Sequence, residues 1–244
     1  MFSILKSKPS LAELIPKEFV DIHSHMLPGI DDGAKEMKDT QFLLESMLQL
    51  GFEKVITTPH TMSGVWANTP ETITEAYHLV KKELPDLANK TKLQAASEYL
   101  LDENCIEAAN KGELLTLKDN LVLVELSFIS APIQLYDYLF ELQLKGYKPV
   151  LAHPERYAYF FNKKEEYARL KKAGCLFQLN LLATVGYYGK EVLETADFLL
   201  KNDGYDFAGS DMHHKKHLDA FHNKVLCKEK NKLENVMKQN IRFK

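Results

Sequence analysis

The chain has 244 residues, 45% of them hydrophobic, and no break in composition, which fits one large domain such as an α/β barrel. Its formal charge of −3 provides no basic surface for a phosphate backbone, so we expect no nucleic-acid partner. Three cysteines without a Cys-x-x-Cys pair argue against disulfides or structural zinc and favour the cytoplasm, and no apolar run approaches the ~20 residues of a transmembrane segment.

Short apolar or β-branched runs alternate with longer amphipathic stretches. The predicted strands cover 19–22, 54–57, 93–97, 121–126, 149–152, 175–179 and 206–209. The predicted helices between them cover 38–50, 70–84, 103–111, 132–145, 163–173 and 188–201, and 228–244 is expected to form a final surface helix. Strict alternation favours a parallel sheet covered by helices, and seven units favour its closure into a barrel. No phosphate-binding glycine motif follows a strand, so an open nucleotide-binding sheet is not expected.

Residues of the types that bind metals follow every predicted strand except the sixth. Asp21-Ile-His-Ser-His25 places His23 and His25 two residues apart, so both side chains can point at one ion. The later strands add Asp31 and Asp32 from the first connection, then His60, Glu98, Glu125, His153, Asp211 and His213. Because the active face of a parallel barrel lies where its strands end, these side chains are expected to meet.

Each of these residues also has an interpretation that needs no metal. Glu98 would then be a solvated loop acid, His60 a helix cap, and Glu125 a buried partner for an arginine. Glu125 is the most informative, because its neighbours in sequence are apolar and a buried carboxylate without a cation is costly.

Five histidines and several carboxylates without a thiolate form a ligand set suited to manganese, iron or zinc. The set is too large for one ion, and two or three ions sharing Glu98 would use all of it, as in sites that hydrolyse phosphate esters. His78 and His222 are expected at the surface. His214 and His217 are expected in the loop after the last strand, either meeting an anionic substrate or solvated.

Several motifs together resemble a known family. They are Asp-Ile-His-Ser-His-Met-Leu-Pro-Gly-Ile-Asp-Asp-Gly-Ala (21–34), Thr-Pro-His (58–60), Val-Glu-Leu-Ser-Phe (124–128), Ala-His-Pro-Glu-Arg-Tyr (152–157) and Gly-Ser-Asp-Met-His (209–213). Over residues 18–215 the chain resembles the polymerase-and-histidinol-phosphatase (PHP) superfamily, and within it the bacterial protein tyrosine phosphatases of capsule and exopolysaccharide operons. The resemblance implies a distorted (β/α)7 TIM-like barrel, a trinuclear site usually supplied with manganese, with iron or zinc as alternatives, and a bacterial tyrosine kinase as phosphotyrosine substrate.

The resemblance also implies roles for individual residues. One ion would bind His23, His25, Glu98 and Asp211; a second would bind Glu98, Glu125 and His153; a third would bind His60, His213 and either Asp31 or Asp32, with Asp32 preferred. Arg156 would bind the phosphoryl group, the alternative being an ion pair with Glu155 or another acid. Relatives often carry a second arginine after Asp-x-His; here Lys215, Lys216 and His217 stand there, and we assign His217 to substrate binding.

The expected domain organisation is an N-terminal extension over residues 1–17 and a single PHP-type barrel over 18–244. The extension has three interpretations: a barrel plug, an oligomer contact or a membrane-proximal tether. A homo-oligomer is expected because relatives oligomerise. Three alternative functions stay open: a histidinol or other small-molecule phosphatase, an amidohydrolase, which commonly has a lysine where this chain has Glu125, and a non-catalytic kinase-docking barrel. No cysteine has an arginine six residues later, so a thiolate phosphatase mechanism has no candidate.

Overall fold

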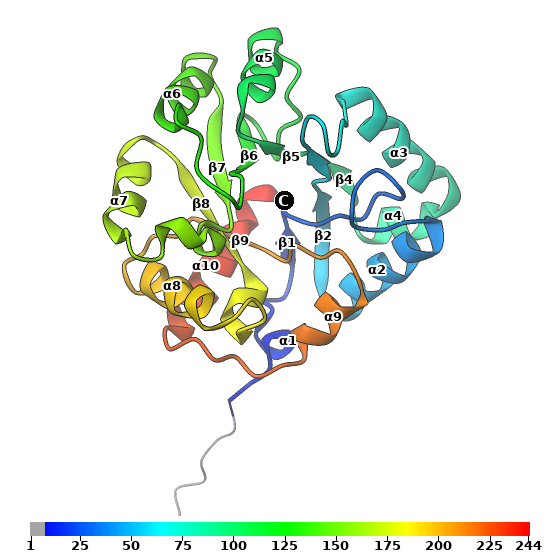
Figure 1. The fold of residues 1–244 in the computed structure, drawn as a ribbon. Helices are drawn as coiled ribbons and strands as arrows, with labels where there is room; N and C mark the ends of the chain where they lie inside the picture. Colours follow the sequence, from blue (N-terminus) through cyan, green and yellow to red (C-terminus); the bar gives the residue numbers. More distant parts are fainter. Residues whose placement is uncertain (1–7) are drawn as a thin grey trace, which may run out of the picture.

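In the computed structural model, which describes residues 8–244, parallel strands form a ring with helices around its outside (Figure 1). The strands are β1 (Phe19–Asp21), β2 (Phe52–Thr57), β3 (His60–Thr61), β4 (Gln94–Ala95), β5 (Glu98–Leu100), β6 (Leu121–Glu125), β7 (Lys148–Ala152), β8 (Leu176–Asn180) and β9 (Phe207–Gly209). They pair in the orders β1-β2-β4 and β3-β5-β6-β7-β8-β9, with every named strand pair parallel. The predicted α/β barrel is confirmed.

Two short strands lie beyond the predicted ranges, which gives nine strands in place of seven. β3 follows β2 after Thr58 and Pro59, where the ladder breaks because proline has no N–H to donate to a neighbouring strand. β5 follows β4 after Ala96 and Ser97, and the Ser97 hydroxyl donates to the Pro59 carbonyl (2.9 Å). Glu98, predicted to follow the third strand, begins β5 and pairs with Leu123 of β6.

The seam between the last and first strands closes the ring. The backbone N–H of Asp211 donates to the His23 carbonyl (2.7 Å). The buried carboxylate of Asp21 accepts from the backbone N–H (2.7 Å) and the hydroxyl (2.8 Å) of Ser210. The residues that follow β1 and β9 are thereby held side by side, although about 190 positions separate them in sequence.

The helices cover the outer face of the strands. They are α1 (Leu11–Leu14), α2 (Met37–Gln49), α3 (Pro70–Glu83), α4 (Pro85–Lys90), α5 (Glu103–Lys111), α6 (Leu135–Leu144), α7 (Lys164–Lys172), α8 (Lys190–Lys201), α9 (Lys215–Phe221) and α10 (Lys230–Gln239). Short 3-10 helices are η1 (Pro154–Arg156), η2 (Ala158–Phe160), η3 (Leu181–Val185) and η4 (Asn240–Phe243). All six helices predicted between strands are present. The expectation of a loop at 215–217 is wrong, since these residues begin α9, whose Ala220 and Phe221 are buried.

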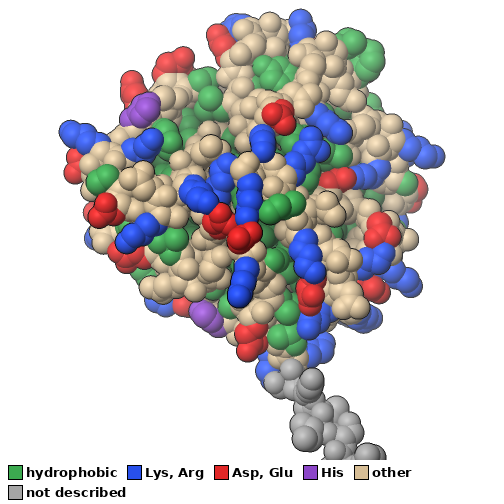
Figure 2. All heavy atoms as spheres, turned by 180° about the vertical axis from the view of Figure 1, so that it is seen from behind, with side chains coloured by type: hydrophobic (Ala, Val, Ile, Leu, Met, Phe, Trp, Pro, Cys, Tyr) green, Lys and Arg blue, Asp and Glu red, His purple; other side chains and the backbone are tan. Residues whose placement is uncertain are grey.

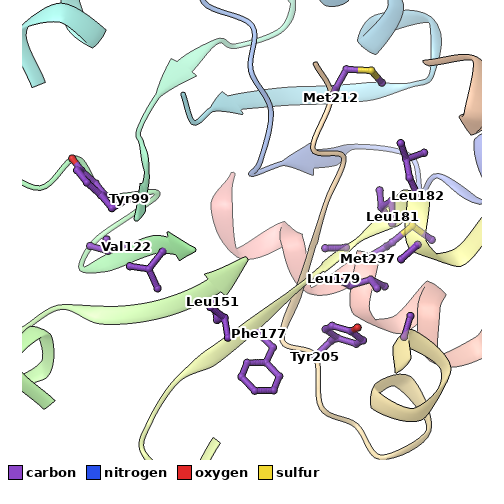
Figure 3. Packing of buried hydrophobic residues seen from close by; sticks show 14 of the residues in the cluster. Tyr99, Val122, Leu151, Phe177, Leu179, Leu181, Leu182, Tyr205, Met212 and Met237 are labelled. Atoms are coloured by element: carbon purple, nitrogen blue, oxygen red, sulfur yellow. The ribbon is translucent and has the colours of Figure 1, made fainter. Parts of the chain in front are cut away.

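Side chains alternate between the ring interior and the helix layer along each strand. On β6, Leu121 and Leu123 belong to the interior cluster, whereas Val122 and Val124 belong to the cluster beneath the helices. Figure 3 shows the outer cluster, with Val122 lying near Leu151 and Phe177 of the next strands. The interior series of β6 ends at Glu125, so the same alternation that builds an apolar interior delivers a carboxylate to its carboxyl end.

The C-terminal segment closes the other end of the ring. Phe243 is fully buried against Phe207 at the start of β9, with ring centroids 4.8 Å apart. The buried Asn240 amide donates to the carbonyls of Val20 (2.8 Å) and Ala208 (2.6 Å). The expectation of one surface helix to residue 244 is therefore wrong beyond Gln239, where the chain turns inward.

The face behind the ring carries basic and acidic side chains side by side (Figure 2). Lys54 donates to the main-chain carbonyl of Phe243 (2.6 Å), and Lys118 donates to that of Arg242 (2.9 Å). These contacts hold η4 against β2 and against the segment that precedes β6.

The described part of the predicted N-terminal extension packs on the outside of the ring. Leu11 is fully buried and its backbone N–H donates to the Asn223 carbonyl (3.0 Å), while Val225 donates to the Pro9 carbonyl (2.9 Å). These residues do not plug the barrel, and residues 1–7 lie outside the described residues. Among the described helices, none combines the length and apolarity needed to cross a bilayer.

We expect Phe243→Ala to lower the free energy of unfolding by about 3–5 kcal/mol, because it removes the aromatic group that fills one end of the barrel. Ile241→Ala is the matched control, since this side chain is 56% exposed and should change stability by no more than about 0.5 kcal/mol. Urea unfolding followed by circular dichroism measures both. Equally small effects of the two substitutions would show that Phe243 does not stabilise this end of the barrel.

Candidate metal centre

The buried carboxylate of Glu98, on β5, lies at the centre of the predicted ligands. Its Oε2 atom is 3.1 Å from His23 Nε2 and 3.1 Å from His60 Nδ1. Its Oε1 atom is 3.1 Å from His153 Nε2. Glu125 Oε1 approaches the same place, 2.8 Å from His60 Nδ1. Residues from four different strand ends therefore converge on one acid.

Asp211, which follows β9, forms a second focus of the cluster. Its Oδ1 atom lies 3.2 Å from His23 Nε2, 3.5 Å from His25 Nε2 and 3.4 Å from His213 Nδ1. Both histidines of the first motif thus face the same carboxylate, as their spacing predicts. Asp211 and Glu98 together bracket the imidazole nitrogens of His23 and His25.

The adjacent aspartates Asp31 and Asp32 point in different directions. Asp31 accepts hydrogen bonds from His25 Nδ1 (2.7 Å), the backbone N–H of His60 (3.1 Å) and that of Gly33 (2.9 Å). Asp32 is half-exposed. Its Oδ1 atom lies 3.6 Å from His60 Nε2 and 3.4 Å from His213 Nε2. The turn needs glycine at position 33, because a Cβ there would lie 2.2 Å from the His25 carbonyl oxygen.

Two residues of the cluster have left-handed backbone conformations that side chains rarely adopt. His153 has φ of 36° and Asp211 has φ of 51°. His153 directly follows β7 and Asp211 follows β9 after Ser210, and both side chains lie in the cluster. Such strain persists only where surrounding contacts over-determine it, and it is typical of functional sites.

The buried atoms of the cluster lack hydrogen-bond partners, which is the observation that tests whether a cation fits. Seven such atoms among the described residues are His23 Nε2, His25 Nε2, His60 Nδ1, both Glu98 oxygens, Glu125 Oε1 and His153 Nδ1. Buried polar atoms are normally paired, because leaving them unpaired costs free energy. Imidazole nitrogens and carboxylate oxygens are ligands of manganese, iron and zinc, so these residues fit divalent ions.

Burial and neighbouring charges shift the pKa values of these groups. Burial opposes charge on His23, yet Glu98 and Asp211 raise its pKa to about 10. Burial likewise opposes charge on His60, and Glu98 and Glu125 raise its pKa to about 12. Burial raises the pKa of Glu125 to about 7, and the negative charge of Glu98 adds to this shift because it disfavours a second carboxylate nearby. The carboxylates thus attract positive charge, from protons or from metal ions.

Two polar residues of β8 hold the cluster, and the sequence did not identify them. Gln178 Oε1 accepts a hydrogen bond from His23 Nδ1 (2.8 Å), which turns Nε2 toward the two carboxylates. Asn180 donates to Asp211 Oδ2 (2.8 Å). Polar residues at alternate positions of an otherwise apolar strand are the signal that the sequence offers, although the sixth predicted strand carries no predicted site residue.

A cavity of about 330 Å³ opens over the cluster. Its lining residues are Asp32, His60, Glu125, Phe128, His153, Arg156, Tyr188, Asp211, His213, His214 and His217. Arg156 Nη1 donates to Asp211 Oδ2 (2.7 Å) and keeps 22% of its side chain exposed. It does not pair with Glu155, whose buried carboxylate accepts from the backbone N–H of Asn180 (2.8 Å) and from the Tyr205 hydroxyl (2.9 Å).

The remaining histidines differ in their surroundings. His217 lines the cavity but is buried, with Nδ1 lying 3.0 Å from the Asp211 carbonyl oxygen, and His214 beside it is exposed. His78 and His222 are exposed, as expected.

A parallel β/α barrel that gathers histidines and carboxylates at its carboxyl-terminal mouth is a barrel of the metal-dependent hydrolase class. A zinc-bound amidohydrolase from Burkhoderia ambifaria shares this fold, with a TM-score of 0.50 and 11% identity over 96% of this chain and 86% of the other. The chain belongs to the family described as capsular polysaccharide synthesis, CpsB/CapC, whose sequence model matches residues 19–242. The resemblance found in the motifs is confirmed.

Individual relatives agree with the activity expected from the sequence. Tyrosine-protein phosphatase YwqE of Bacillus subtilis is 30% identical over 81% of this chain and 78% of the relative. Tyrosine-protein phosphatase CpsB of Streptococcus pneumoniae is 27% identical over 80% of this chain and 82% of the relative. A chain from the crystal structures of YwqE and CpsB, described as metal-dependent tyrosine phosphatases, matches with a TM-score of 0.77 and 28% identity over 88% of this chain and 86% of that one.

We expect Gln178→Leu to weaken divalent-metal binding about 10- to 100-fold, because His23 would lose the acceptor that fixes its tautomer and ring orientation. Competition against a metal-sensitive chelating dye measures the affinity, and a thermal melt checks that the variant is folded. Gln49→Leu, the same change at an exposed position at the end of α2, is the control. A loss no greater than that of the control would show that Gln178 does not support the centre.

Proposed function

We propose that this chain is a metal-dependent protein tyrosine phosphatase, and that its substrate is a bacterial tyrosine kinase controlling capsule or exopolysaccharide synthesis. The observation that carries the proposal is the convergence of unpaired, buried ligand atoms on Glu98 beneath a cavity lined by Arg156. The family of the chain and the names of its relatives support the same reaction.

The proposed ligands divide into overlapping sets. His23, His25, Glu98 and Asp211 would hold one ion; Glu98, Glu125 and His153 would hold a second; Asp32, His60 and His213 would hold a third. Three groups of residues each have ligand atoms close enough to share an ion. They are His23, His25 and Asp211; His23, Glu98 and His153; and His25, Asp32, His60 and His213. His60 is also close enough to share one with Glu98 and Glu125. Asp31 is proposed to orient His25 through its hydrogen bond rather than to bind metal.

Manganese is the proposed ion, with iron or zinc as alternatives, because the ligand set contains imidazoles and carboxylates without a thiolate. Bound divalent ions supply an activated water and neutralise charge on a phosphoryl group.

The residues of the chain bind and orient the substrate. The Arg156 guanidinium, at the edge of the cavity, is proposed to hold phosphoryl oxygens through charge-assisted hydrogen bonds, and His217 to contact the substrate beside it. No protein nucleophile is required. Burial raises the pKa of the thiols of Cys105, Cys175 and Cys227 to about 12, so none provides a thiolate.

We also propose where the protein acts, in which form it works, and how its substrate reaches the cavity. The described cysteines are free and buried, which supports action in a reducing cytoplasm. A homo-oligomer is proposed as the working form. The phosphotyrosine is proposed to reach the cavity on a loop or tail of the kinase, since the metal ligands lie below the surface.

The reaction is tested by treating the protein with a chelator and then titrating manganese. We expect hydrolysis of a phosphotyrosine peptide to be lost on chelation and restored by manganese, because protonated histidines can neutralise the buried carboxylates but cannot supply an activated water. Histidinol phosphate is assayed in parallel, and preferential hydrolysis of it would favour the small-molecule phosphatase. No phosphoester hydrolysis at any manganese concentration would favour the non-catalytic docking barrel.

The role of Arg156 is tested by Arg156→Ala. We expect kcat/KM for the phosphotyrosine peptide to fall about 100- to 1,000-fold, because a preorganised donor to the phosphoryl oxygens is removed. Metal content should be retained, since Asn180 still donates to Asp211. Arg169→Ala, on the exposed face of α7, is the control. Loss of the metals from Arg156→Ala would instead indicate a structural role.

A further inference from the structure

The guanidinium of Arg156 lies between two aromatic rings at the cavity edge. Its Cζ atom is 4.8 Å from the centroid of Phe128 and 4.2 Å from that of Tyr188. Tyr188 is fixed in turn by Asn180, whose amide donates to the Tyr188 hydroxyl (3.1 Å). Cation–π contacts of this kind orient a guanidinium without using its hydrogen-bond donors. The donors of Arg156 that do not bind Asp211 are thereby left for a ligand.

Phe128 differs from Tyr188 because much of its ring is free. One side stacks near His153, with centroids 5.7 Å apart and planes at 26°, yet the side chain remains 49% exposed. Packing against Arg156 and His153 therefore uses only part of this ring. Phe128 lines the cavity, so a ligand that enters can contact this ring.

The segment that follows Phe128 toward α6 also exposes apolar side chains. Ile129 and Ile133, in the connection between β6 and α6, are 92% and 98% exposed. The metal cluster itself is lined by charged and polar groups, so an apolar contact is available only at the rim. A ligand that places a phosphoryl group on Arg156 would extend its remaining part past Phe128.

The geometry points to Phe128 as the residue that recognises the aromatic ring of the leaving group, an inference that rests on the proposed phosphatase function. In an aryl phosphate the ring is joined directly to the bridging oxygen, so it lies at the rim when the phosphoryl group contacts Arg156. Offset or edge-to-face contact with the exposed part of Phe128 then favours the aryl ester. An alkyl phosphate with a methylene at this point offers no π-face, and Phe128 thus selects phosphotyrosine over phosphoserine.

A pair of non-hydrolysable ligands tests this inference without relying on turnover. Benzylphosphonate and ethylphosphonate, in which a methylene replaces the bridging oxygen, are titrated into the manganese-loaded protein by calorimetry. We expect the wild-type protein to bind benzylphosphonate more tightly. In Phe128→Ala, the ratio of the two affinities should fall about three- to tenfold toward one, whatever loss the two ligands share. Phe128→Leu, which keeps apolar bulk but removes the ring, should also lose the preference.

Ile133→Ala is the control, because this side chain is 98% exposed in the same connection but does not line the cavity. Its affinity ratio should match that of the wild-type protein. As a second readout, the ratio of kcat/KM for a phosphotyrosine peptide to that for the matched phosphoserine peptide should fall in Phe128→Ala by a similar factor.

Several outcomes overturn the inference. Equal affinities of the wild-type protein for both phosphonates would do so. An equal weakening of both ligands in Phe128→Ala would show that Phe128 acts only through Arg156, and an unchanged ratio in both Phe128 variants would show that the ring is not read. Failure of the proposed function is distinguishable, because the wild-type protein would then hydrolyse no phosphotyrosine peptide at any manganese concentration.

Discussion

The carboxylate of Glu98 is the contact on which the centre depends. It is fully buried and lies within 3.1 Å of nitrogens from three histidines that reach it from different strand ends. A buried acid with both oxygens unpaired is unfavourable unless positive charge is nearby, so the cluster needs protons or cations to be stable. The same requirement explains the raised pKa of His23 and His60, which carry that charge in the absence of other cations. A site built in this way favours folding and ion binding together.

The barrel meets this requirement by alternation of side chains along its strands. The positions that fill the interior with Leu121 and Leu123 continue to Glu125, and those of β8 continue to Gln178 and Asn180. The ring is closed at the seam by Asp21 and Ser210, and at the opposite end by Phe243. Packing at one end and polar contacts at the other are therefore consequences of one geometry, in which apolar layers lie beneath the proposed ligands.

Sequence patterns predicted the barrel and the meeting of the ligands because both depend on local periodicity and on the shared edge of parallel strands. They did not predict contacts between segments that are distant in sequence. The inward turn of η4 depends on Val20 and Ala208, about 220 and 32 positions from Asn240. The separate directions of Asp31 and Asp32 depend on the turn at Gly33. This turn is tight because Gly33 packs against the His25 carbonyl, a contact that the sequence does not reveal. Gln178 looked like an ordinary strand residue, since its partner His23 lies 155 positions away.

The segment from His153 to Arg156 joins a proposed metal ligand to the residue proposed to bind the phosphoryl group. His153 follows β7 in a left-handed conformation, and η1 begins at the next residue, so Arg156 follows the proposed metal ligand by three positions. The Arg156 N–H donates to the His153 carbonyl (2.9 Å), and its guanidinium reaches Asp211 on the far side of the cluster. The group proposed to hold the phosphoryl oxygens is thus fixed to the ligands by one turn and by one ion pair. The left-handed conformation of His153 falls at the point where β7 gives way to η1, so the strained residue is the one that joins the barrel strand to the turn carrying Arg156.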